Sequence, residues 1–264
     1  MPLFPPRALI GMVHTHALPG SPRHRYPIDR TIRDAVAEAR ILARAGFDAI
    51  LLENMHDRPY ILPPHDPATT ASMTRIAAAV HDAHPGLPLG IQILACGERE
   101  ALAVALASGA SFIRCENFVF AHVADEGLMP AAAAGPLLRY RRSIGAEHIS
   151  VLADIKKKHA AHAITADLSL GEAAHGAEFF GADGVIVTGA ATGMPTDPDD
   201  VAAACEASGL EVYVGSGVTP RDARALFKAG AAGLIVGSSI KKAGRWVNPV
   251  DPARARALVT ALRR

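Results

Sequence analysis

The chain has 264 residues, half of them hydrophobic, and its 27 basic and 26 acidic residues leave a formal net charge of +1. Scattered charges exclude the basic face of a nucleic-acid or anionic-membrane binder, and no apolar run approaches the ~20 residues of a membrane span. The length and even composition predict one soluble domain covering residues 1–264.

Short apolar runs alternate with helix-length segments along the chain. The runs are residues 8–13, 49–52, 89–94, 112–113, 149–152, 185–187, 212–214 and 234–236. Most of them follow a glycine, which suits the left-handed position just past a helix, and a continuous apolar run suits a strand buried on both faces. Eight repeats predict an α/β fold that closes as a parallel (β/α)8 TIM barrel. An open doubly wound sheet is the alternative.

Polar residues gather directly after the predicted strands. They occupy residues 14–16, 53–57, 114–117, 154–159, 188–193, 215–217 and 237–239. In a barrel of this kind, the loops that follow strands carry function and the loops that precede strands carry stability. The sequence therefore predicts a ligand site at the carboxyl ends of the strands.

Two glycine-rich loops follow the seventh and eighth predicted strands. They contribute Gly215, Ser216 and Gly217, and then Gly237 and Ser238. Small residues let backbone N–H groups approach an anion, and the start of a short helix adds further donors. We therefore expect a phosphate site here and a phosphorylated small-molecule substrate. The alternative is that both loops are only tight turns.

Several long motifs resemble the BtpA/SgcQ family of barrel proteins. In chain order they are IGMVHTHALPGSP from Ile10, ILLENMHDRPY from Ile50, FIRCENFVFAHVADEGLM from Phe112, DIKKKHAAHAIT from Asp154, VTGAATG from Val187 and VGSGVT from Val214. The resemblance implies the barrel fold and a site at the strand ends. Residues 93–98 lack the Asn-Asp pair that members commonly carry, and Glu116 resembles a branch distinct from the family's photosynthetic namesake.

Four residues are the candidate catalytic groups. Asp154 and Lys156 leave the fifth predicted strand, where alternation would point both side chains into the barrel mouth. Glu53 and Glu116 end the second and fourth strands, so both carboxylates would face the same cavity. Such a set predicts acid/base or Schiff-base chemistry. Structural ion pairs are the alternative for the carboxylates, and a solvated basic loop is the alternative for the lysine.

Other polar residues at strand ends are candidates for substrate binding. They are His14, Asn54, Arg114, Asn117, His159, Thr188 and Gly189. The spacing of His14 and His16 is typical of metal-dependent barrel hydrolases, but Thr188 and Ser238 stand where such sites need histidine and aspartate. A binuclear centre is therefore not expected. No cofactor is assigned, and one divalent metal ion held by His14, Glu53 or Asp154 is left open.

The sequence also bears on partners and location. Cys96, Cys115 and Cys205 are an odd, widely spaced set that is typical of a reducing compartment, so we expect a cytoplasmic protein. The loop that holds His122 predicts either a lid or a subunit interface. Barrels of this kind often form homo-oligomers, and we expect one here.

Two classes of function remain. The first is an enzyme, namely a lyase, isomerase or hydrolase that acts on a sugar phosphate or nucleotide-like metabolite. The second is a non-catalytic assembly or regulatory factor of the BtpA type. Clustered ionisable residues at one end of the barrel favour the enzyme, because an assembly factor has no need of them.

Overall fold

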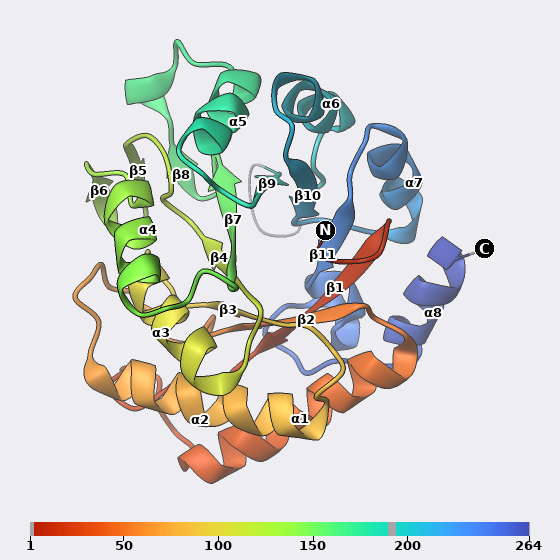
Figure 1. Cartoon of the computed structure of the whole chain (residues 1–264). Coiled ribbons are helices and arrows are strands. Elements are labelled where there is room, and N and C mark those ends of the chain that lie inside the picture. The colour runs from red at the N-terminus through yellow and green to blue at the C-terminus, as the bar shows by residue number, and fades with distance from the viewer. Residues whose placement is uncertain (1–2, 190–193, 264) are drawn as a thin grey trace.

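The computed structural model of the chain describes residues 3–189 and 194–263. Within them, eight parallel strands close into a barrel, and the last strand pairs with the first (Figure 1). In barrel order they are β1 (Ala8–His14), β2 (Ala49–Glu53), β3 (Leu89–Gln92), β4 (Phe112–Cys115), β7 (Ser150–Ile155), β9 (Gly184–Thr188), β10 (Glu211–Gly215) and β11 (Gly233–Val236). The predicted TIM barrel is confirmed.

The helices surround the barrel on the outside (Figure 1). They are α1 (Ile28–Ala45), α2 (Pro67–Ala83), α3 (Glu98–Ser108), α4 (Ala134–Ser143), α5 (Leu170–Phe179), α6 (Pro198–Ala207), α7 (Pro220–Lys228) and α8 (Pro252–Arg263). Local sequence explains their ends. Asp66 caps α2 before its first-turn proline, and Ser169 forms a capping box with Glu172 at α5. Gly46 ends α1 in the left-handed conformation, as expected for the residue after a helix.

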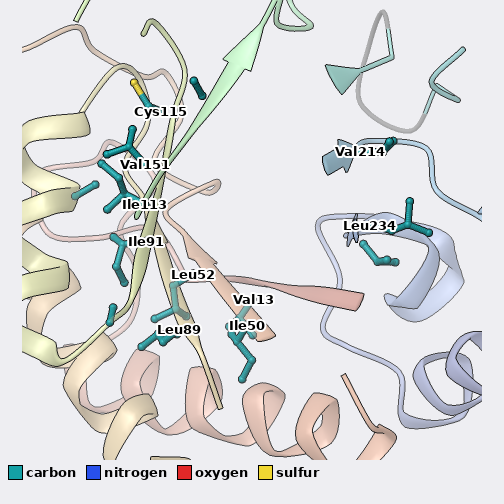
Figure 2. Close-up of a cluster of buried hydrophobic side chains, with 14 of the residues drawn as sticks. Val13, Ile50, Leu52, Leu89, Ile91, Ile113, Cys115, Val151, Val214 and Leu234 are labelled. Carbon is teal, nitrogen blue, oxygen red and sulfur yellow. The ribbon is translucent and has the colours of Figure 1, made fainter. Parts of the chain in front are cut away.

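Side chains alternate between two hydrophobic layers. The outward-facing ones pack between strands and helices, and Figure 2 shows part of this layer, including Val13, Ile50, Leu52, Leu89, Ile91, Ile113, Val151, Val214 and Leu234. The inward-facing layer fills the barrel with Ile10, Leu51, Phe112, Leu152, Ile186, Tyr213 and Ile235. Because both faces of each strand are buried in these layers, the strand sequences must be continuous apolar runs.

The amino-terminal end of the barrel is closed by Phe4. Its ring makes edge-to-face contacts with Phe112 and Tyr213, with ring centroids 5.1 and 5.6 Å apart. This plug fills one end of the barrel with apolar side chains, and the polar cavities lie at the other end, where the strands finish.

Two local features differ from the sequence-based expectation. The third strand was expected to reach Leu94 but ends at Gln92, because the Leu94 amide donates to Asn54 Oδ1 at 2.8 Å instead of to a neighbouring strand. The segments after β4 and β7 also form a small antiparallel sheet, with β5 (His122–Ala124) between β6 (Gly127–Met129) and β8 (Ala160–Ala161). Short 3-10 helices cover Ala163–Thr165, Ser238–Ile240 and Lys242–Gly244.

Candidate active site at the barrel mouth

A ring of inward-facing residues tops the apolar barrel interior. Alternation from the interior layer assigns one residue to each strand end, namely His14, Glu53, Gln92, Arg114, Asp154, Thr188, Gly215 and Gly237. Apart from the two glycines, these positions are polar, whereas the positions two residues earlier are apolar or glycine. The barrel therefore changes from a packed core to a polar cavity floor at this level.

Arg114 and Asp154 form a buried ion pair in this ring. The guanidinium donates from Nε to Oδ1 at 3.0 Å and from Nη2 to Oδ2 at 3.0 Å. Neighbouring strands β4 and β7 carry the two residues, and this fixes their separation. Two parallel hydrogen bonds orient the guanidinium plane. Asp154 therefore holds Arg114 in the cavity instead of standing there as a free carboxylate.

His14 and Glu53 lie side by side at the ends of paired strands β1 and β2. His14 Nδ1 is 3.2 Å from the Trp246 carbonyl oxygen, which only accepts hydrogen bonds, so Nδ1 carries the proton of that bond. The other ring nitrogen, Nε2, then faces Glu53 Oε2 at 3.5 Å. Burial lowers the pKa of His14 well below its usual value and raises the pKa of Glu53. The pair is placed to take up or release a proton.

Glu116 is engaged by two donors. Lys157 Nζ lies 3.1 Å from Glu116 Oε1, and the Cys96 backbone amide donates to Oε2 at 3.1 Å. Charge pairing with Lys157 contributes to a lowered pKa of Glu116, against the raising effect of burial. This carboxylate is therefore ionised and held in place.

The placement of Lys156 corrects the expectation from alternation. Its ammonium donates to the Leu168 carbonyl, outside the cavities that hold Glu53. The reason lies in the backbone, because β7 ends at Ile155 and Lys156 adopts a positive φ of 45°. Period-two alternation holds only within a strand. Lys157 and Lys158 line the cavities at the mouth instead.

The first cavity, of 480 Å³, joins the ionisable groups to the glycine-rich loops. Its lining includes His14, Glu53, Arg114 and Lys158, together with Ser216, Gly217, Gly237 and Ser238. Arg245 and Arg254 add two cations that the sequence analysis missed, because they follow β11 in segments without a strand-end pattern. The first cavity can therefore accept an anion beside the His14–Glu53 pair.

The second cavity, of 270 Å³, opens on the side of β2, β3 and β4. It shares Glu53, Met55, Arg114, Lys158 and Trp246 with the first cavity. It adds Gln92, Glu116 and His159 among other residues. Gln92 is buried and its Oε1 has no hydrogen-bond partner among the described residues. Alternation from Gly90 could have identified Gln92 as a site residue.

Other predicted binding residues stabilise loops. Asn54 Nδ2 donates to Asp57 Oδ2 at 2.9 Å, and Asn117 Nδ2 donates to the Ala131 carbonyl at 2.8 Å. Thr188 Oγ1 accepts from the Lys158 amide at 3.0 Å. Gly189 lies against the backbone of residues 194–195, and the rest of its predicted loop, residues 190–193, is outside the described residues.

The geometry of the described residues also bears on metal ligation and membrane insertion. Over residues 3–189 and 194–263, no three side chains of His, Cys, Asp or Glu are grouped so that they could hold a metal ion. Within the same ranges, no helix has the length and apolar character needed to cross a membrane.

Comparison with known proteins identifies the family. The BtpA family model matches residues 6–264. The chain belongs to the BtpA family. An uncharacterized mitochondrial protein of Caenorhabditis elegans is 44% identical over 250 residues, which cover 93% of this chain and 89% of that protein. The photosystem I biogenesis protein BtpA of Synechocystis is 36% identical over 255 residues, with 96% and 87% covered.

The fold of this BtpA-family chain is similar to that of solved barrel enzymes. The structure of 3-hexulose-6-phosphate synthase aligns with a TM-score of 0.60 and 18% sequence identity, and the alignment covers 96% of this chain and 99% of that one. At this identity the likeness shows the fold alone.

Proposed function

We propose that this BtpA-family chain is an enzyme that moves a proton on a small phosphorylated metabolite bound at the barrel mouth. One observation carries the proposal: the first cavity is lined both by the glycine-rich loops after β10 and β11 and by the His14–Glu53 pair. An anion site beside a proton-exchanging pair is what a lyase, isomerase or hydrolase of a sugar phosphate or nucleotide-like compound needs.

The phosphate is assigned to Gly215, Ser216, Gly217, Gly237 and Ser238. Gly217 has a positive φ of 63°, and a side chain at Gly217 would collide with the backbone of Met194, so this position of the loop requires glycine. Arg245 and Arg254 line the same cavity and would balance the charge of a phosphate. The similar barrel of 3-hexulose-6-phosphate synthase is, by its name, an enzyme of a phosphorylated sugar.

Catalytic roles follow from which groups are free to exchange protons. Glu53 and His14 act as the acid and base, because burial favours the neutral form of each. Among the described residues, neither forms a two-point ion pair of the kind that joins Arg114 to Asp154. Asp154 and Glu116 keep Arg114 and Lys157 in position around the substrate. These two carboxylates thus contribute by orienting cations toward developing negative charge.

A non-catalytic assembly role is the second candidate. The 36% identity to the photosystem I biogenesis protein BtpA, which extends over most of both chains, favours it. The buried, paired ionisable groups favour the enzyme. Burying charged groups costs free energy, and a surface that only binds a partner does not need buried charges.

Hydrogen exchange into substrate separates these candidates. The protein is incubated in D2O with a panel of sugar phosphates and nucleotides. Mass spectrometry follows the gain of deuterium at carbon in each compound and the conversion of any compound into a product. We expect one compound to react, and we expect Glu53→Gln to slow that reaction at least ~10²-fold, the lower end for loss of a general acid or base. Glu147→Gln, at an exposed ion pair, is the matched control. Reaction at the normal rate in Glu53→Gln would refute the assigned role.

The proposal extends to location and assembly. We propose a cytoplasmic enzyme that acts as a homo-oligomer and has no nucleic-acid partner. Three free cysteines, two of them buried, are compatible with a reducing compartment. The Caenorhabditis elegans relative is, by its name, a mitochondrial protein. Size-exclusion chromatography with light scattering tests the oligomer.

A further inference from the structure

Within the described residues, Lys158 differs from its two lysine neighbours because its ammonium has no hydrogen-bond or ion-pair partner. Lys156 donates to the Leu168 carbonyl and Lys157 pairs with Glu116. The Lys158 ammonium has no hydrogen bond or ion pair with any residue in the described ranges, and its backbone amide is fixed to Thr188 Oγ1. A positioned backbone with an uncommitted side chain is typical of a residue that acts on a ligand.

The place of Lys158 in the mouth also favours a role in contacting a ligand. Its side chain is half-buried and lines both the first and the second cavity, on the wall that they share with Glu53 and Arg114. A molecule whose phosphate is bound by the loops after β10 and β11 would extend from there across the first cavity. Its other end would therefore meet Lys158 where the two cavities join.

The surroundings also raise the fraction of uncharged amine at a given pH. Burial lowers the pKa of Lys158, and the nearby Arg114 guanidinium lowers it further, while Glu53, Asp154 and Glu116 act in the opposite direction. A neutral amine is a nucleophile, whereas an ammonium is not.

We propose that Lys158 forms an imine with the carbonyl group of a phosphorylated aldehyde or ketone bound in the first cavity. This assignment rests on the proposed function and narrows its substrate class. The neutral amine nitrogen bonds to the carbonyl carbon, and proton transfer from nitrogen to oxygen gives a carbinolamine. The carbinolamine hydroxyl then takes up one proton and leaves as water, while the nitrogen lone pair forms the C=N bond of the iminium.

The formation of the iminium would explain why an amine, a proton-exchanging pair and a phosphate site share one cavity. Glu53 and His14 line the first cavity with Lys158 and are placed to supply the proton that departs with water. Once formed, the iminium withdraws electrons from the adjacent carbon, so that a C–H or C–C bond there breaks more readily. The reaction class is then a lyase or isomerase and not a hydrolase.

Pyridoxal 5′-phosphate is a suitable probe, because it carries a phosphate and an aldehyde on one small molecule. The protein is incubated with the probe, reduced with borohydride, digested and mapped by mass spectrometry. We expect the reduced adduct on Lys158, with labelling at least about tenfold faster than by pyridoxal, because phosphate binding places the aldehyde next to the amine. Lys158→Arg, which keeps the positive charge, should lose the adduct, while Lys156→Arg should retain it.

Each outcome bears on a different part of the proposal. An adduct spread over exposed lysines such as Lys228 and Lys242, or one that persists in Lys158→Arg, overturns the role of Lys158. Mapping the labelled lysines of the wild-type protein tests the role of Lys158 even if a variant fails to fold. Inorganic phosphate is added as a competitor. If labelling is selective for Lys158 but phosphate does not slow it, the reactive amine is supported and the phosphate site is refuted. Competition by phosphate without an adduct on Lys158 supports only the phosphate site and overturns the imine.

Discussion

Arg114 Nη2 lies 3.0 Å from Asp154 Oδ2, and Nε donates to the same carboxylate, so that two neighbouring barrel strands are joined by a charged pair at the cavity floor. Both side chains are buried, with 6% and 2% of their surface exposed. Taking both charges out of water costs about as much as their attraction returns, so the pair adds little net stability. Its main effect is to hold a guanidinium in a fixed orientation at the wall of the two cavities.

Breaking this pair from one side should destabilise the barrel. Asp154→Asn leaves Arg114 as a buried cation without its counter-ion, and we expect the free energy of unfolding to fall by about 3 kcal/mol. Urea denaturation followed by far-UV circular dichroism measures the change. The double variant Arg114→Met with Asp154→Leu should recover most of the loss, because it removes both buried charges.

The exposed pair between Arg142 and Glu147 provides the matched control. Its partners are 83% and 44% exposed, so Glu147→Gln should change the free energy of unfolding by less than about 1 kcal/mol. If Asp154→Asn were as mild as Glu147→Gln, Arg114 would be stabilised by water or by Glu53, and the holding role of Asp154 would be wrong.

Gly217 offers a direct test of the proposed phosphate loop. A β-branched side chain at Gly217 would meet the backbone of Met194, so Gly217→Val must displace the loop that we assign to the anion. We expect the dissociation constant for inorganic phosphate to rise at least about tenfold, which corresponds to 1.4 kcal/mol. Trp246 is the only tryptophan in the sequence and lines the first cavity, so its fluorescence can report the titration.

Gly145→Val separates loop geometry from backbone strain. Gly145 has a φ of 69°, close to the 63° of Gly217, and no heavy atom lies within 4 Å of a Cβ built on it. Both variants therefore carry a similar left-handed backbone penalty. Phosphate binding should survive in Gly145→Val. Equal losses in the two variants would mean that strain, and not the loop after β10, controls binding.

The barrel could be predicted from sequence because its signal is local and repeated. Each strand is buried on both faces, so each is a continuous apolar run, and several runs follow a glycine that ends the preceding helix. Alternation from the interior residues also predicts the polar ring, including Gln92, which lies two residues after Gly90.

The cavity walls could not be predicted in the same way. Lys156 departs from alternation because its positive φ ends the strand. Nothing in a run of three lysines shows that the second and third turn toward the cavities. Trp246 and Arg254 reach the first cavity from segments after β11, and their approach to His14 and Ser239 depends on tertiary packing. The periodicity of a strand or helix relates residues within one element and cannot predict contacts between such distant residues.

Glu98, the first residue of α3, should make stability depend on pH. Its Oε1 accepts hydrogen bonds from the Glu116 and Asn117 amides, both at 3.2 Å, yet burial raises the pKa of Glu98 to about 7, and the charge of Glu116 adds to the rise. Between the ordinary pKa of 4.5 and the folded value, the folded state binds more protons than the unfolded state. The contribution of Glu98 to stability is therefore complete below about pH 4.5 and declines until about pH 7.

Glu98→Gln keeps the accepting oxygen and removes the titration. At 1.36 kcal/mol for each pKa unit, the wild type loses up to about 3 kcal/mol between these pH values that the variant does not lose. We expect both proteins to unfold at the same urea concentration at pH 4.5 and the variant to be more stable at pH 8. Glu147→Gln, at an exposed position, controls for the loss of one negative charge. A Glu98→Gln effect that stays constant from pH 4.5 to pH 8 would show that Glu98 is ionised throughout, with its charge balanced by the two amides.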